Sequence, residues 1–215
     1  MGKHFILFDF DGVILDSYKI AFAAQNVVCP DCTEEQYRQL FEGNIFEQIS
    51  MGSIHTNRCH HADFWDHYIP QLKDEGTLVP GMDAVISALA EVHRMIIVSS
   101  GQTPFIENFL AENALLEYFS AILGNNVHKS KEEKIRMVFE THGVSASDCV
   151  FVTDTVGDVR EADKMGVGAI GVTWGYHEPE RFSKVDHFRL VHTPESLPSA
   201  IDDYFARTQT SVSIR

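Results

Sequence analysis

A short apolar segment near the N-terminus ends in two aspartates, and no other feature of the chain limits its fold as strongly. Residues 5–8 are Phe-Ile-Leu-Phe, and Asp9, Asp11 and Gly12 follow closely. An apolar run of this kind predicts a buried strand of a parallel sheet. Alternation along the strand would place Asp9 and Asp11 on one face, and Gly12 would allow a sharp turn. Two neighbouring carboxylates repel unless a cation or a proton separates them, so the pattern predicts a site at this strand end.

A second segment repeats this design later in the chain. Residues 149–153, Cys-Val-Phe-Val-Thr, predict another buried strand, and Asp154 and Asp158 follow it. Asp158 alone could be the cap of the next helix, but a cap explains one acid and not two. The carboxyl ends of parallel strands meet at one edge of a sheet, so we expect the two acidic pairs to converge there.

Polar residues also follow a strand predicted over residues 95–98. Ser99, Ser100 and Gly101 come directly after it, although such a triplet by itself is ordinary loop composition. Further along, Ser130 is followed three residues later by a glutamate, which is the spacing of a capping box. This spacing predicts a helix that begins in a segment rich in lysine.

The sequence Asp-Phe-Asp-Gly-Val at residues 9–13 resembles the first motif of the haloacid dehalogenase (HAD) superfamily of phosphohydrolases. The resemblance implies that Asp9 is the nucleophile and Asp11 the general acid and base. Asp154 and Asp158 match the fourth motif of the family, and Thr153 stands where many members have glycine. Oxygen ligands of this kind suit Mg²⁺ better than zinc. The metal site that the resemblance implies consists of Asp9, Asp11, Asp154 and Asp158.

The second and third motifs of the family supply groups that bind phosphate. The second motif is a serine or threonine at a strand end, and Ser99 fits that position. The third is a lysine near a helix start that neutralises both the nucleophile and the phosphate. Lys131 is the favoured candidate and Lys129 the alternative, whereas Lys134 is interpreted as a solvated side chain. The resemblance implies four substrate-binding residues, namely Ser99, Ser100, Gly101 and Lys131.

These motifs predict an α/β fold with a Rossmann-like, three-layer parallel sheet. Residues 1–16 and 78–215 are expected to form this core, with further strands at 121–123 and 168–172. Residues 17–77 contain helical stretches and no strand pattern, which predicts a helical insertion after the first strand. In the HAD family such an insertion is a C1-type cap over the active site.

Spacing and composition predict several further elements. Thr-Glu-Glu-Gln at residues 33–36 has a capping-box pattern, and apolar spacing predicts helices over 82–93 and 194–204. Residues 208–215 are polar, and we expect them to be frayed. The segment Thr-Trp-Gly-Tyr-His at residues 173–177 follows a strand and resembles a segment of phosphoglycolate phosphatase-like members, so we expect it to border the site.

Cysteine and histidine residues in the predicted cap raise the question of a second metal site. Residues 29–32 are Cys-Pro-Asp-Cys, and Cys59 precedes two histidines. Structural zinc sites usually have two cysteine pairs at regular spacing, and a redox pair would open a helix after a sheet strand. We therefore interpret Cys29 and Cys32 as small apolar side chains at a helix junction. A solvated or substrate-facing surface is the interpretation for four histidines, His55, His60, His61 and His67.

Composition limits the partners and the compartment. The 215 residues carry a net charge of −14 and no basic block, which argues against nucleic acid or an anionic membrane as partner. No apolar run is long enough to cross a bilayer, and no signal-peptide pattern precedes the first strand. We expect a cytoplasmic monomer or homodimer that binds a small phosphorylated substrate. The cysteines expected to be reduced are Cys29, Cys32, Cys59 and Cys149.

The resemblance implies a Mg²⁺-dependent phosphatase of the phosphoglycolate phosphatase-like branch, acting on a small metabolite through an aspartyl phosphate. A phosphomutase of the β-phosphoglucomutase type would share Asp9 and Asp11, but its histidine after the first motif is absent from residues 17–22. A non-catalytic phosphate- or metal-binding module would keep the fold, and the full set of charged residues argues against it. A dehalogenase is disfavoured because that branch lacks an acid at position 11.

Overall fold

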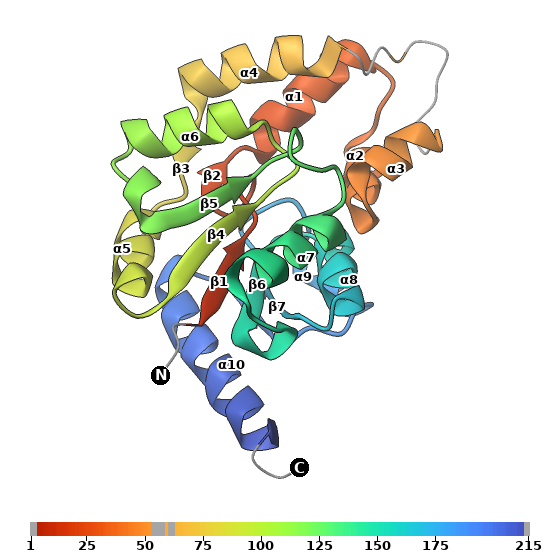
Figure 1. Ribbon diagram of the computed structural model, residues 1–215. Coiled ribbons are helices and arrows are strands. Elements are labelled where there is room, and N and C mark those ends of the chain that lie inside the picture. The colour runs from red at the N-terminus through yellow and green to blue at the C-terminus, as the bar shows by residue number, and fades with distance from the viewer. Residues whose placement is uncertain (1–3, 53–58, 60–62, 213–215) are drawn as a thin grey trace.

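The computed structural model describes residues 4–52, 59 and 63–212, and within them it contains a six-stranded sheet with helices on both faces (Figure 1). The strand order is β5-β4-β1-β6-β7-β8, and every neighbouring pair is parallel. The strands are β1 (Phe5–Phe8), β4 (Arg94–Val98), β5 (Phe119–Leu123), β6 (Cys149–Thr153), β7 (Gly168–Val172) and β8 (Arg189–Val191). The predicted Rossmann-like α/β fold is confirmed, and β8 is an edge strand that the sequence pattern did not predict.

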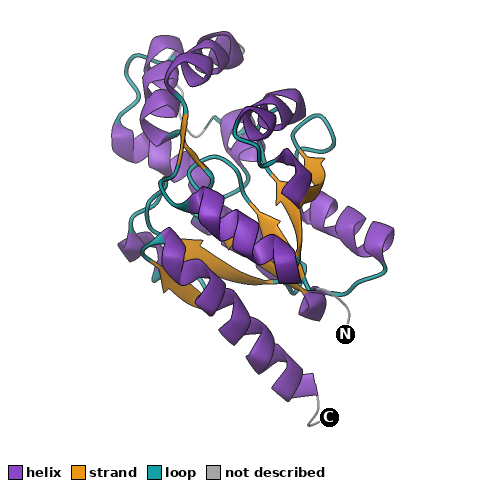
Figure 2. Ribbon diagram, turned by 90° about the vertical axis from the view of Figure 1, so that its left-hand side faces the viewer, coloured by secondary structure: helices purple, strands orange, loops and turns teal. Residues whose placement is uncertain are grey.

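Alternate side chains of β1 enter two different cores, which is why this strand is apolar throughout. Ile6 and Phe8 pack with the helices of one layer, whereas Phe5 and Leu7 pack with those of the other. The first layer consists of α5 (Met82–Val92), α6 (Thr103–Glu112) and α10 (Leu197–Val212). The second contains α7 (Lys131–His142) and α8 (Val156–Lys164). Figure 2 shows the strands between helices on both sides.

A group of helices between β2 (Leu15–Asp16) and β3 (Thr77–Leu78) lies at the end of the sheet opposite α10 and both chain termini (Figure 1). We call this group the cap. Its elements are α1 (Tyr18–Val28), α2 (Glu34–Gln39), η1 (Leu40–Glu42), α3 (Ile45–Ser50) and α4 (Phe64–Glu75). The strands β2 and β3 pair with each other in an antiparallel ribbon, which the sequence pattern did not predict. Both chain crossings between cap and core therefore run side by side.

The capping box predicted for α2 is confirmed. The Thr33 hydroxyl accepts a hydrogen bond from the Gln36 backbone N–H, and the Gln36 side chain accepts one from the Thr33 backbone N–H. Helix α10 continues to Val212, so the expectation that the chain is frayed from residue 208 is wrong for residues 208–212. Four further short helices are η3 (Leu116–Tyr118), η4 (Ala146–Asp148), α9 (Pro179–Phe182) and η5 (Pro194–Ser196). In the part of the chain that the structure describes, no helix has the length and apolar character needed to span a membrane.

Cys29 and Cys59 form a disulfide with a Cα–Cα distance of 4.2 Å, so the expectation that all four cysteines are reduced is wrong for this pair. Cys32 and Cys149 are free and buried. In the sequence, the cysteine nearest to Cys29 is Cys32. The fold instead brings Cys59, which is 30 residues away in sequence, next to the C-terminal end of α1.

The disulfide also bears on the possibility of a metal site in the cap. It occupies two of the thiols that such a site would use. Among the described residues, no group of three histidine, cysteine or acidic side chains could hold a metal ion. His67 is partly buried on α4. Three of the cap histidines lie outside the described residues, namely His55, His60 and His61.

Candidate active site

A cavity of about 350 Å³ lies between the carboxyl ends of the central strands and the cap. The strands end at the same edge of the sheet, so residues far apart in sequence reach it together. All the residues predicted to act in catalysis or binding line this cavity, namely Asp9, Asp11, Ser99, Ser100, Gly101, Lys131, Asp154 and Asp158.

Lys131 lies between two of the predicted carboxylates. Its Nζ is 3.0 Å from Oδ2 of Asp9 and 2.6 Å from Oδ2 of Asp158, and the side chain is only 3% exposed. Thr153, at the end of β6, donates its hydroxyl hydrogen to Asp158 Oδ2 over 2.7 Å. The Lys131 backbone N–H donates to Oε1 of Glu161 over 2.9 Å, which fixes the start of α7 against α8. Thr153 and Glu161 were not predicted as site residues.

The three candidate lysines occupy different environments. Lys129 is exposed and does not line the cavity, so the structure brings Lys131 and not Lys129 to Asp9. The interpretation of Lys134 as a solvated side chain is wrong, because it is fully buried and its Nζ donates to the Ser99 carbonyl oxygen over 2.5 Å. Residues three apart share one face of a helix, so the inward position of Lys131 was the signal that Lys134 also faces inward.

The charges of this group are strongly coupled. Burial raises the pKa of Asp9 well above its ordinary value, Lys131 opposes that shift, and Asp158 and Asp154 add to it. Burial also acts to raise the pKa of Asp158, but Lys131 and hydrogen bonds hold it below the ordinary value. Burial lowers the pKa of Lys131, yet Asp158 and Asp9 outweigh that effect and raise it. The lysine therefore stays charged beside Asp9.

A residue of the cap holds Asp11 in place, and the sequence did not predict this residue. The hydroxyl of Tyr68, on α4, donates to Oδ1 of Asp11 over 2.5 Å. Burial raises the pKa of Asp11, and hydrogen bonds from Tyr68 and Ser17 oppose that shift. No motif marks Tyr68, because its role depends on how the cap folds back over β1.

The turn after β4 approaches Asp11 from the opposite side. Ser99 Oγ accepts a hydrogen bond from the Gly101 backbone N–H over 2.9 Å, which leaves the hydroxyl hydrogen available to a ligand. A Cβ added to Gly101 would lie 3.2 Å from Oδ2 of Asp11 and 3.3 Å from Oγ of Ser99. A larger residue there would press on both side chains, so the turn packs tightly against the carboxylate.

Asp154 lies in a tight backbone cradle. Its Oδ2 accepts the Tyr176 N–H over 2.7 Å, and its Oδ1 is buried with no hydrogen-bond partner. A Cβ at Gly12 or Gly175 would lie 2.0 or 2.2 Å from Oδ2, so the backbone approaches as closely as it can. Gly12 also has a φ of 75°, which favours glycine. Burial raises the pKa of Asp154 to about 7.

The donor set around Asp154 fits a hard divalent cation. A buried carboxylate oxygen without a hydrogen bond needs a partner, and oxygen donors with room for water suit Mg²⁺. Asp9, Asp154 and the main-chain carbonyl of Asp11 are the groups that would hold it. Within the described residues no three acidic, histidine or cysteine side chains form a metal cluster. Lys131 lies between Asp9 and Asp158 and neutralises part of their charge.

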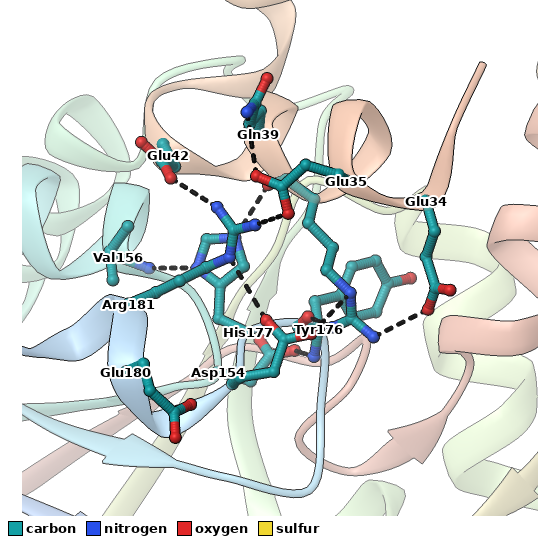
Figure 3. Close-up of polar contacts among 12 residues, drawn as sticks. Glu34, Glu35, Gln39, Glu42, Asp154, Val156, Tyr176, His177, Glu180 and Arg181 are labelled. Carbon is teal, nitrogen blue, oxygen red and sulfur yellow. Dashed lines mark hydrogen bonds and ion pairs between the residues drawn. The ribbon is translucent and has the colours of Figure 1, made fainter.

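The segment 173–177 borders the cavity as expected. Tyr176 lines it, and the Nδ1 of His177 accepts the Val156 N–H at the start of α8 over 3.0 Å (Figure 3). The Trp174 indole N–H donates to the Val13 carbonyl oxygen over 3.1 Å. These bonds fix the segment between β7 and the turn after β1.

Two contacts hold the cap against the core beside this segment. Arg181, on α9, donates to Glu42 over 2.6 Å and also pairs with Glu35, both of them cap residues (Figure 3). The second contact is at Gly157, where an added Cβ would lie 2.6 Å from the carbonyl oxygens of both Phe41 and Gly43. The cap therefore sits directly on the first turn of α8, which carries Asp158.

Comparison with known proteins finds relatives that cover most of the chain. The chain is 26% identical over 223 residues to the phosphoglycolate phosphatase of Yersinia pseudotuberculosis serotype I (strain IP32953), covering 92% of this chain and 95% of the relative. It is also 26% identical over 205 residues to the phosphoglycolate phosphatase of Synechococcus elongatus, covering 91% and 96%.

Solved structures show the same fold. A predicted phosphatase from Clostridium acetobutylicum superposes with a TM-score of 0.74 at 21% identity, covering 94% of this chain and 100% of the other. CbbY from Rhodobacter sphaeroides, in complex with phosphate, gives the same values. Residues 6–172 match the family described as haloacid dehalogenase-like hydrolase, and the chain therefore belongs to that family of enzymes.

Proposed function

We propose that this phosphatase is Mg²⁺-dependent and hydrolyses a small phosphorylated metabolite through an aspartyl phosphate on Asp9. The observation that carries the proposal is the position of Lys131, which lies 3.0 Å from Asp9 and 2.6 Å from Asp158 in the cavity. A lysine there offsets the repulsion between a carboxylate nucleophile and a phosphate monoester, which carries about two negative charges near neutral pH.

In the first step, one carboxylate oxygen of Asp9 attacks phosphorus while the bond to the leaving oxygen breaks. Asp11 gives its proton to that oxygen, so the product departs as a neutral alcohol. Ser99 donates its hydroxyl hydrogen to a phosphoryl oxygen, since its Oγ already accepts the Gly101 N–H. The Phe10 N–H, which donates to Asp9 Oδ1 over 2.8 Å, orients the nucleophile.

In the second step, Asp11 is ionised and takes a proton from a water molecule, which attacks phosphorus of the aspartyl phosphate. The bond from phosphorus to Asp9 breaks, and inorganic phosphate and the free carboxylate result. Tyr68 holds Asp11 in place during both steps because its hydroxyl donates to Oδ1 of Asp11. Mg²⁺ bound by Asp9, Asp154 and the Asp11 carbonyl would supply charge neutralisation for the phosphoryl group.

The test is turnover by Asp9→Asn, with Asp16→Asn as a matched control. Asp16 is exposed on β2 and does not line the cavity. The amide is a poor nucleophile of the same size, so Asp9→Asn is expected to lower kcat by at least about a thousandfold without loss of structure. Asp16→Asn should turn over as the wild type does. Asp9 is not the nucleophile if its amide variant keeps a tenth of the wild-type rate.

A further inference from the structure

We infer that the group esterified to phosphate is apolar, an aromatic ring or a short hydrocarbon chain; this rests on the proposed function. The cavity has two chemically different halves. The core half holds the acidic side chains and Lys131, and the cap half is lined mainly by apolar side chains. These are Ala21, Leu40, Phe41, Ile45, Phe46, Ile49, Phe64 and Trp65.

No described cap residue that lines the cavity is charged. Among the described lining residues Lys131 is the only cation, and it is already paired with Asp9 and Asp158. A substrate with a second anionic group, such as the carboxylate of phosphoglycolate, would place that group against the apolar wall. A carboxylate buried without a cation or hydrogen-bond donors is strongly disfavoured.

Two arginines at the contact between cap and core are engaged elsewhere. Arg38, on α2, pairs with Glu34 over 3.0 Å and with Glu178 over 2.9 Å. Arg181 pairs with Glu35 and Glu42 (Figure 3). Neither arginine lines the cavity, so both serve to hold the cap and not to meet a substrate anion.

A polyhydroxylated leaving group also fits poorly. Each hydroxyl that leaves water needs a new partner, and the polar cap groups in the wall are Gln25, Tyr37 and Tyr68. The Tyr68 hydroxyl hydrogen is already donated to Asp11. The Gln25 Nε2 is buried without a hydrogen bond of ordinary geometry, and the Cys32 thiol beside it is a weak partner. The Tyr37 side chain has a hydrogen-bond partner in Tyr176, so the Gln25 amide is the main donor that the cap side of the cavity offers, which is too little for a ligand with several hydroxyls.

The size of the cavity limits the substrate further. Its volume of about 350 Å³ lies near the lower end of the range of roughly 300–1,000 Å³ for ligand sites. A phosphoryl group with one ring or a short chain matches both this volume and the aromatic lining, because rings pack well against Phe46 and Trp65.

The experiment compares benzyl and hexyl phosphate with phosphoglycolate and ribose 5-phosphate at saturating Mg²⁺. In all four esters the leaving oxygen belongs to an alcohol. The acidity of the leaving group therefore does not decide which ester is hydrolysed fastest. We expect kcat/KM for benzyl phosphate to exceed that for phosphoglycolate by at least about tenfold, the scale of discrimination by hydrophobic pockets.

The outcomes separate this inference from the proposed function. One outcome is that all four esters are hydrolysed in an Asp9-dependent reaction and phosphoglycolate or ribose 5-phosphate is the best substrate. This result would overturn the inference of an apolar leaving group and would leave the proposed phosphatase mechanism intact. Hydrolysis that survives in Asp9→Asn, or none of any ester, overturns the proposed function and this inference with it.

A pair of variants tests whether the apolar side chains of the cap determine the preference for an apolar leaving group. Phe46→Ala removes a lining ring, and Phe188→Ala removes a partly buried ring that does not line the cavity. The readout is the ratio of kcat/KM for benzyl phosphate to that for methyl phosphate, which cancels a general loss of folded protein. We expect Phe46→Ala to lower this ratio at least about fivefold and Phe188→Ala to leave it unchanged. An equal ratio in wild type and Phe46→Ala would contradict the inference.

Discussion

The phenolic oxygen of Tyr68 lies 2.5 Å from Oδ1 of Asp11, so a cap helix holds the carboxylate that we propose as proton donor and acceptor. The two residues are 57 positions apart in sequence. This contact makes the state of the cap relevant to the chemistry, because Asp11 is fully constrained only while α4 lies over it.

Tyr68→Phe should therefore lower kcat/KM by about ten- to a hundredfold, since hydrogen bonds to charged groups contribute about 1.5–3 kcal/mol. The matched control is Tyr18→Phe, which removes a hydroxyl that donates to Glu34 over 2.8 Å at the surface. Steady-state kinetics on one alkyl phosphate would measure both. Similar losses in the two variants would show that the Tyr68 hydroxyl has no special role.

The role of Asp11 can be tested by changing the leaving group. If Asp11 protonates the departing oxygen, Asp11→Asn should slow alkyl phosphates far more than aryl phosphates, whose phenolate leaves with less help. General acid catalysis contributes about a hundred- to ten-thousandfold, so the ratio of alkyl to aryl rates should fall by a comparable factor. The rates are measured for wild type and variant at saturating Mg²⁺. An unchanged ratio would exclude the acid role even if both rates declined.

Mg²⁺ should raise the melting temperature of the wild type, since it binds the folded protein and relieves repulsion among the buried carboxylates. Asp154→Ala removes the oxygen that is buried without a hydrogen bond, and it should abolish this increase. Asp163→Ala, an exposed acid on α8, is the control and should respond as the wild type does. Differential scanning calorimetry with and without Mg²⁺ measures the shift. An equal increase in Asp154→Ala would place the cation elsewhere.

Lys134 should make stability depend on pH. Burial, together with the nearby charge of Lys131, lowers the pKa of Lys134 from 10.5 to about 8. The unfolded chain thus holds this proton more tightly than the folded protein does. The buried charge therefore lowers the free energy of unfolding by about 3 kcal/mol, at 1.36 kcal/mol per pKa unit, and this cost is fully present below pH 8. The cost is lost as the pH rises from about 8 to 10.5. The wild type should therefore gain stability relative to Lys134→Met over this range.

Urea unfolding at pH 7 and pH 10 measures this difference in the free energy of unfolding. Lys129→Met, which changes an exposed lysine on the loop before α7, should show no comparable change relative to the wild type. A constant difference between wild type and Lys134→Met would mean that Lys134 keeps its proton throughout.

The sequence predicted the core strands and the residues that meet at their ends because those signals are local. Asp9 and Asp154 each follow directly on an apolar run, and the register of neighbouring strands then brings them together. The strand β8 was missed because it has only three residues at the sheet edge, too few for a recognisable pattern.

The contacts between cap and core could not be predicted in this way. Tyr68 reaches Asp11, and Cys59 reaches Cys29, only because of how the cap helices fold back, and no spacing in the sequence reports that. Lys134 was predicted to be solvated because lysine side chains usually are, but its spacing of three residues from Lys131 places it on the buried face of α7.

The balance of charge in the cavity has a thermodynamic consequence. Among the described lining residues, carboxyl groups far outnumber the single ammonium of Lys131; they belong to Asp9, Asp11, Asp154, Asp158 and Glu161. A dianionic ester is repelled by most of these groups, and a divalent cation is attracted by them, so each ligand should strengthen the binding of the other by the same factor. A dissociation constant measured for the ester alone would therefore describe a different equilibrium from the one that operates during turnover.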